Sequence, residues 1–282
     1  MEVDATPLGK PIKGPSAFSG DLGRFVALTV HLAAMEFKLR FFGSALGYLW
    51  QLVRPLLLFG VLYVVFTEFV RLNEGVRYFP AVLLTSIVLF TFFSDATAGA
   101  VTAVVDRENL VRKIQFPRLV VPFAVVATAC LNLLANLLAV IVFILATGVD
   151  PRPEWLLAIP LVAVLVVFAT GLAMLLSALY PRFRDVQPIW EVLSQVLFYG
   201  SPILYVIEVV PNETFRHLIM LSPIASILEQ VRHTVIDPTA PTAAEAIGGS
   251  ELLLIPAAIV LAVLALGFWV FARQAPRLAE EL

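Results

Sequence analysis

Two long apolar runs, residues 79–105 and 119–147, enclose the densely charged segment 106–118. A helix rises about 1.5 Å per residue, so the first run alone is about 40 Å long and crosses a bilayer with some tilt. Further apolar runs lie near residues 48–70, 155–179, 188–205 and 251–271. The chain carries only 14% charged residues, against about 25% in ordinary globular domains. The sequence therefore predicts an all-α integral membrane protein with about six transmembrane helices.

The N-terminal region predicts an interfacial helix over residues 22–42. Apolar residues recur there at helical spacing, while Arg24, His31 and Lys38 repeat every seven positions on another face. Such a helix lies in the membrane interface with its basic side toward the headgroups, although a water-soluble packing helix is the alternative. Residues 1–21 lack an apolar core and are expected to form a disordered cytoplasmic tail, and residues 273–282 a second, charged one.

The stretch before the last span is too polar for a clean span and too apolar for an ordinary loop. Pro202, Pro211 and Pro223 break it. We expect re-entrant outer gate helices over residues 206–235, because non-helical backbone at membrane depth is tolerated where protein shields it. An external loop with short surface helices agrees equally well with the composition. Residues 236–250 are expected to form a flexible linker.

The basic residues predict the orientation of the chain. Fourteen of the 19 Lys and Arg fall on the side that holds both termini and the segment 106–118, and five fall on the other side. By the positive-inside rule the richer side is cytoplasmic. We therefore expect a multi-pass protein of the cytoplasmic (inner) membrane with both termini in the cytoplasm.

The charged segment predicts a short amphipathic helix over residues 106–117. Leu110 and Ile114 lie four apart with Val111 beside them, which gives one apolar stripe, and Arg112 and Lys113 lie off that stripe. The Phe116-Pro117 pair ends the helix. This segment is either a contact helix for a cytoplasmic partner or a solvated loop that satisfies the positive-inside rule. By position alone the loop is preferred.

Motifs for intrinsic chemistry are absent from the sequence. It has no Gly-x-x-x-x-Gly-Lys-Ser/Thr loop, a single cysteine and three scattered histidines, so an enzyme, a metal site and a cofactor on this chain are not expected. Asp95 and Glu191 are the carboxylates that fall inside predicted spans. They are either part of a proton or cation relay or hydrogen-bonded groups that line a wet path or fix helix packing, and we favour the second reading.

Aromatic residues gather in the second and fifth predicted spans. Aromatic faces stack on sugar rings, but most Phe residues in spans contact lipid or pack. A pore role therefore requires that both spans line one path. The pore candidates are Phe90, Phe93, Trp190, Phe198, Tyr199 and Tyr205.

Several motifs in order resemble a known family. These are Leu-Gly-x-Leu-Trp at 46–50, Asn-Leu-Val-x-Lys-x-x-Phe-Pro at 109–117, Arg184-Asp185, and Ser-Pro-Ile-x-Tyr at 201–205. Together they resemble the transmembrane subunits of ABC-2 type polysaccharide exporters, such as those for O-antigen and teichoic acid. Ser222-Pro223 stands where that family often has Asn-Pro, and the helix break is kept.

The resemblance implies an ABC-2 type transmembrane domain over residues 22–272. It also implies a homodimer that is embedded in membrane lipids and binds two copies of a cytoplasmic ATPase, which holds ATP and Mg. No nucleic acid is implied as a partner. The cargo would be a polyprenyl-diphosphate-linked polysaccharide of the O-antigen, teichoic-acid or galactan type. An actinobacterial galactan exporter is one such member, since Ala and Val are abundant and Lys is scarce.

The resemblance also assigns roles to residues. The segment 106–117 would be the coupling helix, and Arg40, Arg54 and Arg184 would be placed to meet the diphosphate. The residues that would contact the ATPase are Asn109, Leu110, Val111, Arg112, Lys113, Ile114, Phe116 and Pro117. Two alternatives stay open: an ABC-2 exporter of drugs or small lipids, and an ATPase-independent membrane carrier or transferase.

Overall fold

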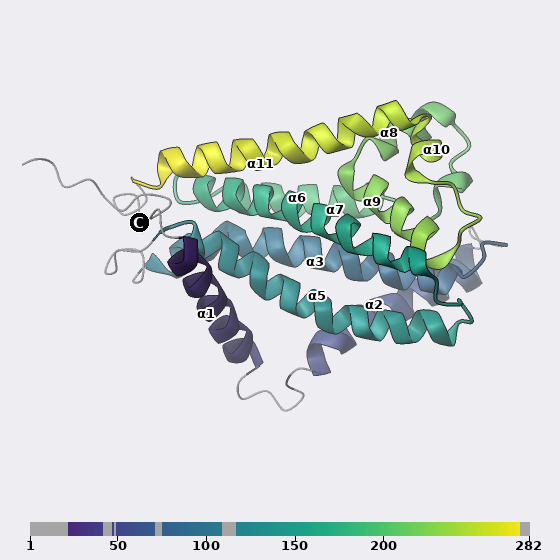
Figure 1. Cartoon of the computed structure of the whole chain (residues 1–282), viewed down its shortest axis with the longest axis horizontal. Helices are drawn as coiled ribbons and strands as arrows, with labels where there is room; N and C mark the ends of the chain where they lie inside the picture. The colour runs from purple at the N-terminus through teal and green to yellow at the C-terminus, as the bar shows by residue number, and fades with distance from the viewer. Residues whose placement is uncertain (1–21, 42–46, 48, 71–74, 109–116, 277–282) are drawn as a thin grey trace, which may run out of the picture.

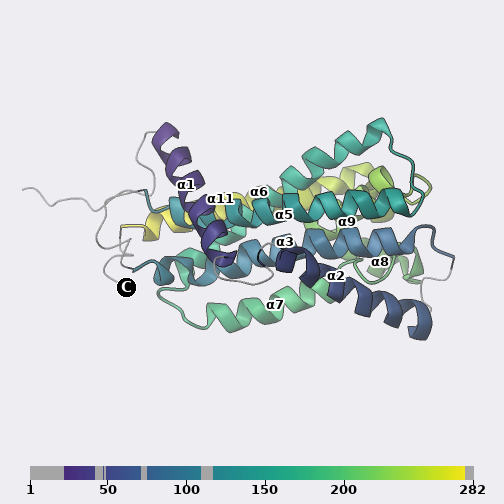
Figure 2. The same cartoon turned by 90° about the horizontal axis from the view of Figure 1, so that it is seen from below.

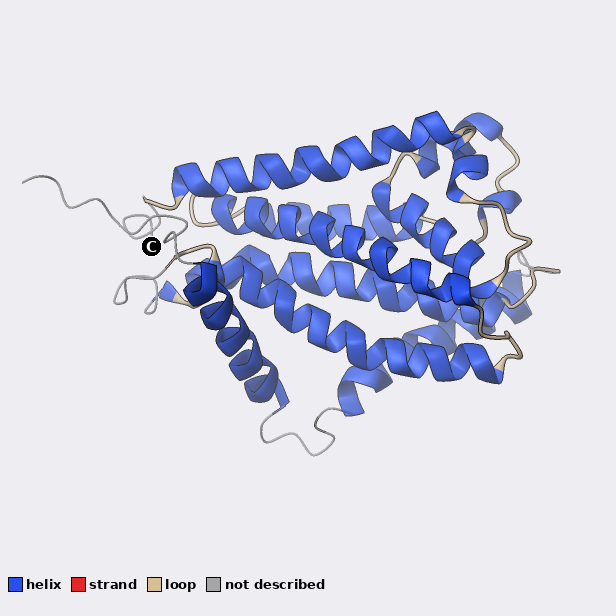
Figure 3. Ribbon diagram, viewed as in Figure 1, coloured by secondary structure: helices blue, strands red, loops and turns tan. Residues whose placement is uncertain are grey.

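The computed structural model describes residues 22–41, 47, 49–70, 75–108 and 117–276. In this part of the chain the structure is helical without strands (Figure 3). Five helical stretches are long and apolar enough to cross a membrane. They are Leu49–Val70, Phe79–Asp106, Val120–Ala146, Pro153–Leu179 and Ser250–Gln274. The predicted all-α membrane class is therefore confirmed.

The long helix α3 (Phe79–Asp106) is the centre of the bundle. It packs against α2 (Leu49–Val64), α5 (Val120–Ala146), α6 (Ala158–Leu179) and α7 (Val186–Gly200) (Figures 1 and 2). Its N-terminal half is buried without interruption from Ala81 to Phe90. A helix that is apolar on all sides is expected in such a surrounded position. The last helix, α11 (Leu254–Gln274), packs on α6 at the edge of the bundle.

The predicted span 188–205 differs most from the structure. Its helix α7 has 15 residues, about 22 Å at 1.5 Å per residue, whereas a full crossing takes about 20 residues. Ser201 adopts extended backbone, with φ −96° and ψ 154°, because the residue before a proline avoids the helical region. The described bundle thus has five helices of spanning length and the shorter α7 beside α3.

The first helix, α1 (Leu22–Phe41), runs obliquely across the end of the bundle where α3 ends and α5 begins (Figure 1). Phe25 and Ala33 are buried against the bundle, and the Phe25 ring meets the Phe123 ring edge-on at 5.3 Å. Leu22, Val30 and Leu39 on the same helix are exposed. Apolar residues therefore serve both the protein contact and an outward surface suited to a membrane interface.

Short helices gather at the other end of the bundle (Figure 1). They are α8 (Glu213–Met220), α9 (Pro223–Val231) and α10 (Ala243–Ile247), with a π-helical turn at Arg232–Ile236. The helix α9 is buried from Pro223 to Glu229 and packs on α3, α6 and α11. The helix α9 is thus shielded by protein, whereas α8 is mostly exposed, and re-entrant outer gate helices over residues 206–235 stay a prediction.

The expectation of a flexible linker over residues 236–250 was wrong. Thr242 and Glu245 form a capping box that starts α10, and Ile236, Ala240 and Ile247 are buried. A Thr-x-x-Glu spacing is a helix-start signal that could have been read from the sequence. The segment is a folded part of the end of the bundle that holds α8, α9 and α10.

The helices α6 and α11 approach most closely at two glycines. A Cβ added at Gly267 would lie 2.1 Å from the carbonyl oxygen of Gly171, and one added at Gly171 would lie 2.8 Å from the backbone of Leu264. Small residues allow this approach in membrane proteins, where packing rather than the hydrophobic effect joins helices. The pair therefore fixes α11 on the bundle.

We predict that Gly267→Ala destabilises the protein by about 1–3 kcal/mol, the usual cost of overpacking, because backbone has to move to admit the methyl group. Ala265→Val adds bulk at an exposed position on the same helix and is expected to be nearly neutral. Thermal or denaturant unfolding of the purified protein in detergent measures both. Equal unfolding midpoints for the two variants would contradict the close glycine contact.

Candidate functional site

The charged segment is described only at its flanks. Residues 109–116, and with them seven of the eight predicted coupling residues, lie outside the described part of the chain, and Pro117 is buried. On the α3 side, Arg107 forms an ion pair with Glu36 of α1 and donates a hydrogen bond of 2.8 Å from Nη1 to the carbonyl of Ala103. This ion pair ties α1 to the end of α3 just before the segment.

The α5 side begins with a buried arginine. Arg118 is only 3% exposed, and its Nε and Nη1 atoms have no hydrogen-bond partner within the described part of the chain. Burial lowers the pKa of its guanidinium. Pro117 and Leu119 are buried as well. The described flank on the α5 side is therefore packed into the bundle, and the flank on the α3 side is tied to α1 through the Arg107–Glu36 ion pair.

The three basic residues proposed for a diphosphate lie on different elements. Arg40 is in α1, with its side chain outside the described part of the chain. Arg54 is exposed on α2, and Arg184 is exposed in the turn between α6 and α7, with its guanidinium 4.8 Å from the centre of the Tyr180 ring. The geometry does not join them into one site within the protomer.

The aromatic candidates divide into packed and exposed side chains. Phe90, Phe93 and Trp190 are buried, and the Trp190 Nε1 donates to Thr97 Oγ1 at 3.2 Å. Phe198 meets Phe90 edge-on at 5.1 Å. These rings hold α7 on α3, so the predicted pore role of Phe90, Phe93 and Trp190 is not supported, because buried rings cannot meet a cargo. Sequence alone could not separate packed from exposed rings.

Two aromatic candidates and one carboxylate remain at accessible positions. Tyr199 is 67% exposed on α7, and Tyr205 is half-buried, with its hydroxyl donating to the carbonyl of Gly200 at 3.3 Å. Glu191 is exposed on α7 and accepts from Gln187 at 3.2 Å. Asp95, by contrast, is half-buried on α3, beside a small cavity shared with α2 and α5.

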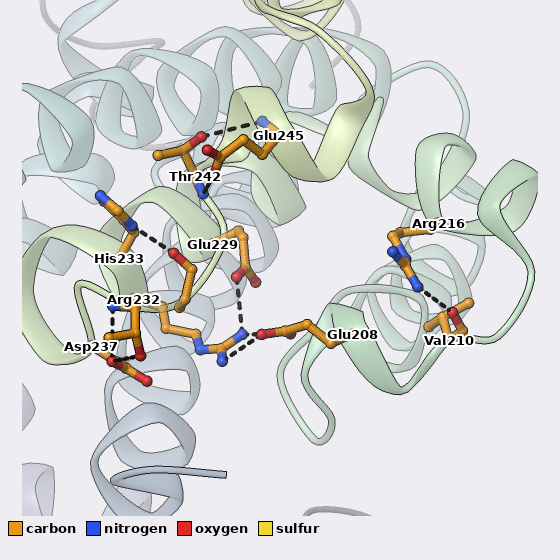
Figure 4. A network of polar contacts seen from close by, with 11 residues as sticks. Glu208, Val210, Arg216, Glu229, Arg232, His233, Asp237, Thr242 and Glu245 are labelled. Carbon is orange, nitrogen blue, oxygen red and sulfur yellow. Dashed lines mark hydrogen bonds and ion pairs between the residues drawn. The ribbon is translucent and has the colours of Figure 1, made fainter.

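A buried arginine clamp orders the opposite end of the bundle (Figure 4). Arg232 donates from Nη1 and Nη2 to the two carboxylate oxygens of Glu208, both at 2.8 Å, and from Nη1 to Glu229 at 3.0 Å. Bidentate hydrogen bonds between arginine and carboxylate are among the stronger polar contacts in proteins. The clamp joins the turn Ile207–Val209, which follows α7, to α9 and the turn after it.

Electrostatics in the clamp work in opposite directions on its two buried members. Burial, reinforced by the charge of Glu208, raises the pKa of Glu229 to about 7, although Arg232 lowers it in part. Burial alone would lower the pKa of Arg232, but the hydrogen bonds and charges of Glu208, Glu229 and Asp237 raise it overall. Arg232 therefore stays charged, whereas Glu229 titrates near neutral pH.

A polar cavity of about 530 Å³ opens beside the clamp. Its polar lining includes the side chains of Glu208, Arg216, His233, Thr239 and Glu245. Carboxylates accept hydrogen bonds from hydroxyl groups, and the guanidinium donates to them. The cavity could therefore hold a small hydroxylated group.

The sequence reasoning missed the clamp. Glu229 and Arg232 lie three apart in a stretch that is about half apolar, and such a spacing places opposite charges on one helix face. The same holds for Asn132 and Asn136, which lie four apart inside an apolar span. Charged or amide pairs at helical spacing inside apolar runs were the available signal.

The chain matches the ABC-2 type transporter family over residues 27–236. It is 28% identical to the O-antigen export system permease protein RfbA of Myxococcus xanthus over 263 residues, which is 93% of this chain and 98% of that protein. A permease of the same name from Klebsiella pneumoniae is 28% identical over 78% of this chain and 84% of its own length. The polysialic acid transport protein KpsM of Escherichia coli is 23% identical over 71% of this chain and 78% of its own length.

We predict that the stability of the protein depends on pH through Glu229. Because the folded state raises this pKa from 4.5 to about 7, the stability that Glu229 contributes is complete below pH 4.5 and is lost as pH rises through about 7. The unfolding midpoint should therefore fall between about pH 5 and pH 8, and it should fall less in Glu229→Gln, which stays neutral. Fluorescence-detected thermal unfolding across this range measures the effect.

The matched control is Glu213→Gln, which removes an exposed carboxylate from α8. It should leave the pH profile of the wild type unchanged. An identical profile for the wild type and Glu229→Gln would show that Glu229 does not titrate in this range.

Proposed function

Because the chain belongs to the ABC-2 type transporter family, we propose that it is the membrane subunit of an ATP-driven exporter of a lipid-linked polysaccharide. The observation that carries the proposal is the match to O-antigen export permeases, one of which is covered over 98% of its length. The five helices of spanning length agree with a permease. The direction of transport is outward across the cytoplasmic membrane.

A separate ATPase supplies the energy. The sequence has no glycine-rich phosphate-binding loop, so ATP and Mg are bound by the partner rather than by this chain. The segment 106–117 is the coupling helix seated on that partner. Its flanks support this role, because Arg107 is ion-paired to Glu36 and Arg118 is buried, so that motion of the segment reaches the spans.

The polar stripe on α7 supports a water-filled path. Gln187, Glu191, Gln195 and Tyr199 follow at four-residue intervals, and the last three are exposed on the surface of the protomer. Polar groups facing lipid are costly, so a stripe of this kind favours an aqueous surface. A second copy of the chain facing this stripe would enclose such a path, and we propose a homodimer on that ground.

The chemistry of the outer end agrees with a polar cargo. The cavity of about 530 Å³ beside the clamp offers carboxylates, a guanidinium and an imidazole, which are suited to sugar hydroxyls. A narrow apolar path for drugs or small lipids would not require such a lining. Arg54 and Arg184, which are exposed, remain the candidates for the diphosphate of the lipid carrier.

The proposal is tested by depleting the chain from its cell and analysing lipid-linked glycans on each side of the membrane. We expect a polyprenyl-diphosphate-linked polysaccharide to accumulate on the cytoplasmic side. Purified chain reconstituted without its ATPase should transport none, because it holds no nucleotide site. Normal glycan distribution, or transport by the chain alone, would overturn the proposal in favour of a drug exporter or of a carrier, respectively.

We further predict that the stripe on α7 meets water in the assembled transporter. With Cys130→Ala as background, Gln195→Cys should react with a small charged thiol reagent during ATP turnover. Leu261→Cys, on the exposed side of α11, should not react, because that side faces lipid. Mass spectrometry of proteoliposomes measures both. Equal labelling of the two positions would contradict an aqueous path at α7.

A further inference from the structure

A small cavity lies inside the bundle where α2, α3 and α5 meet. Its volume is about 10 Å³. Its polar lining consists of Gln51 from α2, Thr91 and Asp95 from α3, and Asn132 and Asn136 from α5. All three helices belong to stretches of membrane-spanning length and hydropathy. Five oxygen-bearing side chains therefore surround a space to which lipid offers no hydrogen bond.

The side chain of Asn132 is the group in this cavity that most needs a hydrogen-bond partner. It is only 3% exposed, and neither its Oδ1 nor its Nδ2 has a hydrogen-bond partner among the residues that the structure describes. Its neighbour Asn136 donates to the backbone carbonyl of Asn132 at 2.9 Å and leaves the amide side chain untouched. An unsatisfied buried polar group costs about 1–3 kcal/mol, and buried polar groups are almost always bonded to protein or to ordered water.

We infer that one ordered water molecule occupies this cavity and bonds to both amide atoms of Asn132. A cavity of about 10–15 Å³ is large enough for a single water molecule. A buried water needs two to four polar partners, and five polar side chains line this cavity. The water donates to Oδ1 and accepts from Nδ2. A sodium ion of similar size would satisfy only Oδ1 and would face the N–H group.

The assignment does not depend on how the amide is oriented. Exchanging the oxygen and nitrogen of Asn132 leaves one acceptor and one donor facing the same cavity. A water molecule serves either arrangement, because it donates and accepts. Both unsatisfied atoms are thus explained by one ligand.

The water bridges α2 to the rest of the bundle. Pro55 is the buried residue of α2, and both Gln51 and Pro55 line the cavity. Much of the remaining surface of α2 is exposed, so the contact of Gln51 and Pro55 with this cavity is one of the few internal contacts of the helix. A bridging water exchanges hydrogen-bond partners more readily than close-packed side chains rearrange. The helix α2 therefore contacts α3 and α5 partly through a water molecule whose hydrogen bonds can rearrange. This inference does not depend on the proposed function.

Radiolytic hydroxyl-radical labelling tests the assignment, because radicals formed from a bound water oxidise the side chains around it. The full-length chain in lipid nanodiscs is irradiated briefly, and oxidised residues are identified by mass spectrometry. We expect oxidation of Pro55, Phe92 and Leu133 above the level at Leu57, which is exposed on α2. In Asn132→Leu the labelling should fall to the Leu57 level, and in Asn132→Ser, which keeps a hydroxyl and leaves room, it should persist.

Two results would overturn the assignment. The first is labelling of Pro55, Phe92 and Leu133 no higher than at Leu57 in the wild type, which is decisive even if Asn132→Leu fails to fold. The second is an unfolding midpoint of the wild type that rises in sodium chloride relative to choline chloride at equal ionic strength. Such a rise, absent in Asn132→Ser, would give the cavity to a cation instead. Equal midpoints in both salts, together with the expected labelling, support the water.

Discussion

Hydrocarbon offers no hydrogen bonds, so every polar group that enters this bundle has to find its partner inside the protein. The buried threonines obey this constraint by bonding back to their own helix, as Thr85 does to the carbonyl of Ala81 and Thr97 to that of Phe93. Arg232 obeys it by meeting two carboxylates at once. Asn132 is one of several described residues with buried polar atoms that find no partner among the described side chains and backbone, and it lines the cavity between α2, α3 and α5. The polar groups therefore mark where the bundle is specified most narrowly, whereas its apolar residues set only the general packing.

The helices differ in how firmly they are held, and the difference follows from what they bury. The pair α6 and α11 meets backbone to backbone at Gly171 and Gly267, which leaves no room for adjustment. The helix α2 buries only Pro55, and α7 buries only Trp190 and Ser194. Buried contact is the main source of local stability, so α2 and α7 are the elements whose positions cost least to change. Both also expose an aromatic side chain, Trp50 on α2 and Tyr199 on α7.

The sequence was sufficient for the all-α membrane class, because runs of apolar residues longer than 20 have few other solutions. It failed where length and pairing decide. The shortness of α7 follows from the turn at Ser201 and Pro202 inside an apolar run. The clamp joins Glu208 to Arg232 over 24 positions, a distance that no local pattern shows. Packed and exposed aromatic side chains, such as those of Phe93 and Tyr199, both occur in apolar runs, and the fold decides which of them is buried.

The polar links also define a route for motion through the molecule. Glu36 and Arg107 join α1 to α3, and the Phe25–Phe123 contact joins α1 to α5, so these three helices respond together at the end that holds the charged segment. At the other end, the Arg232 clamp connects the turn after α7 to the short helices packed on α6 and α11. Packed helices move as rigid bodies rather than deform continuously. A displacement of the charged segment would therefore shift the helices that bury the least surface. These helices are α2 and α7. The water molecule inferred between α2, α3 and α5 would allow α2 to shift, because its hydrogen bonds can rearrange.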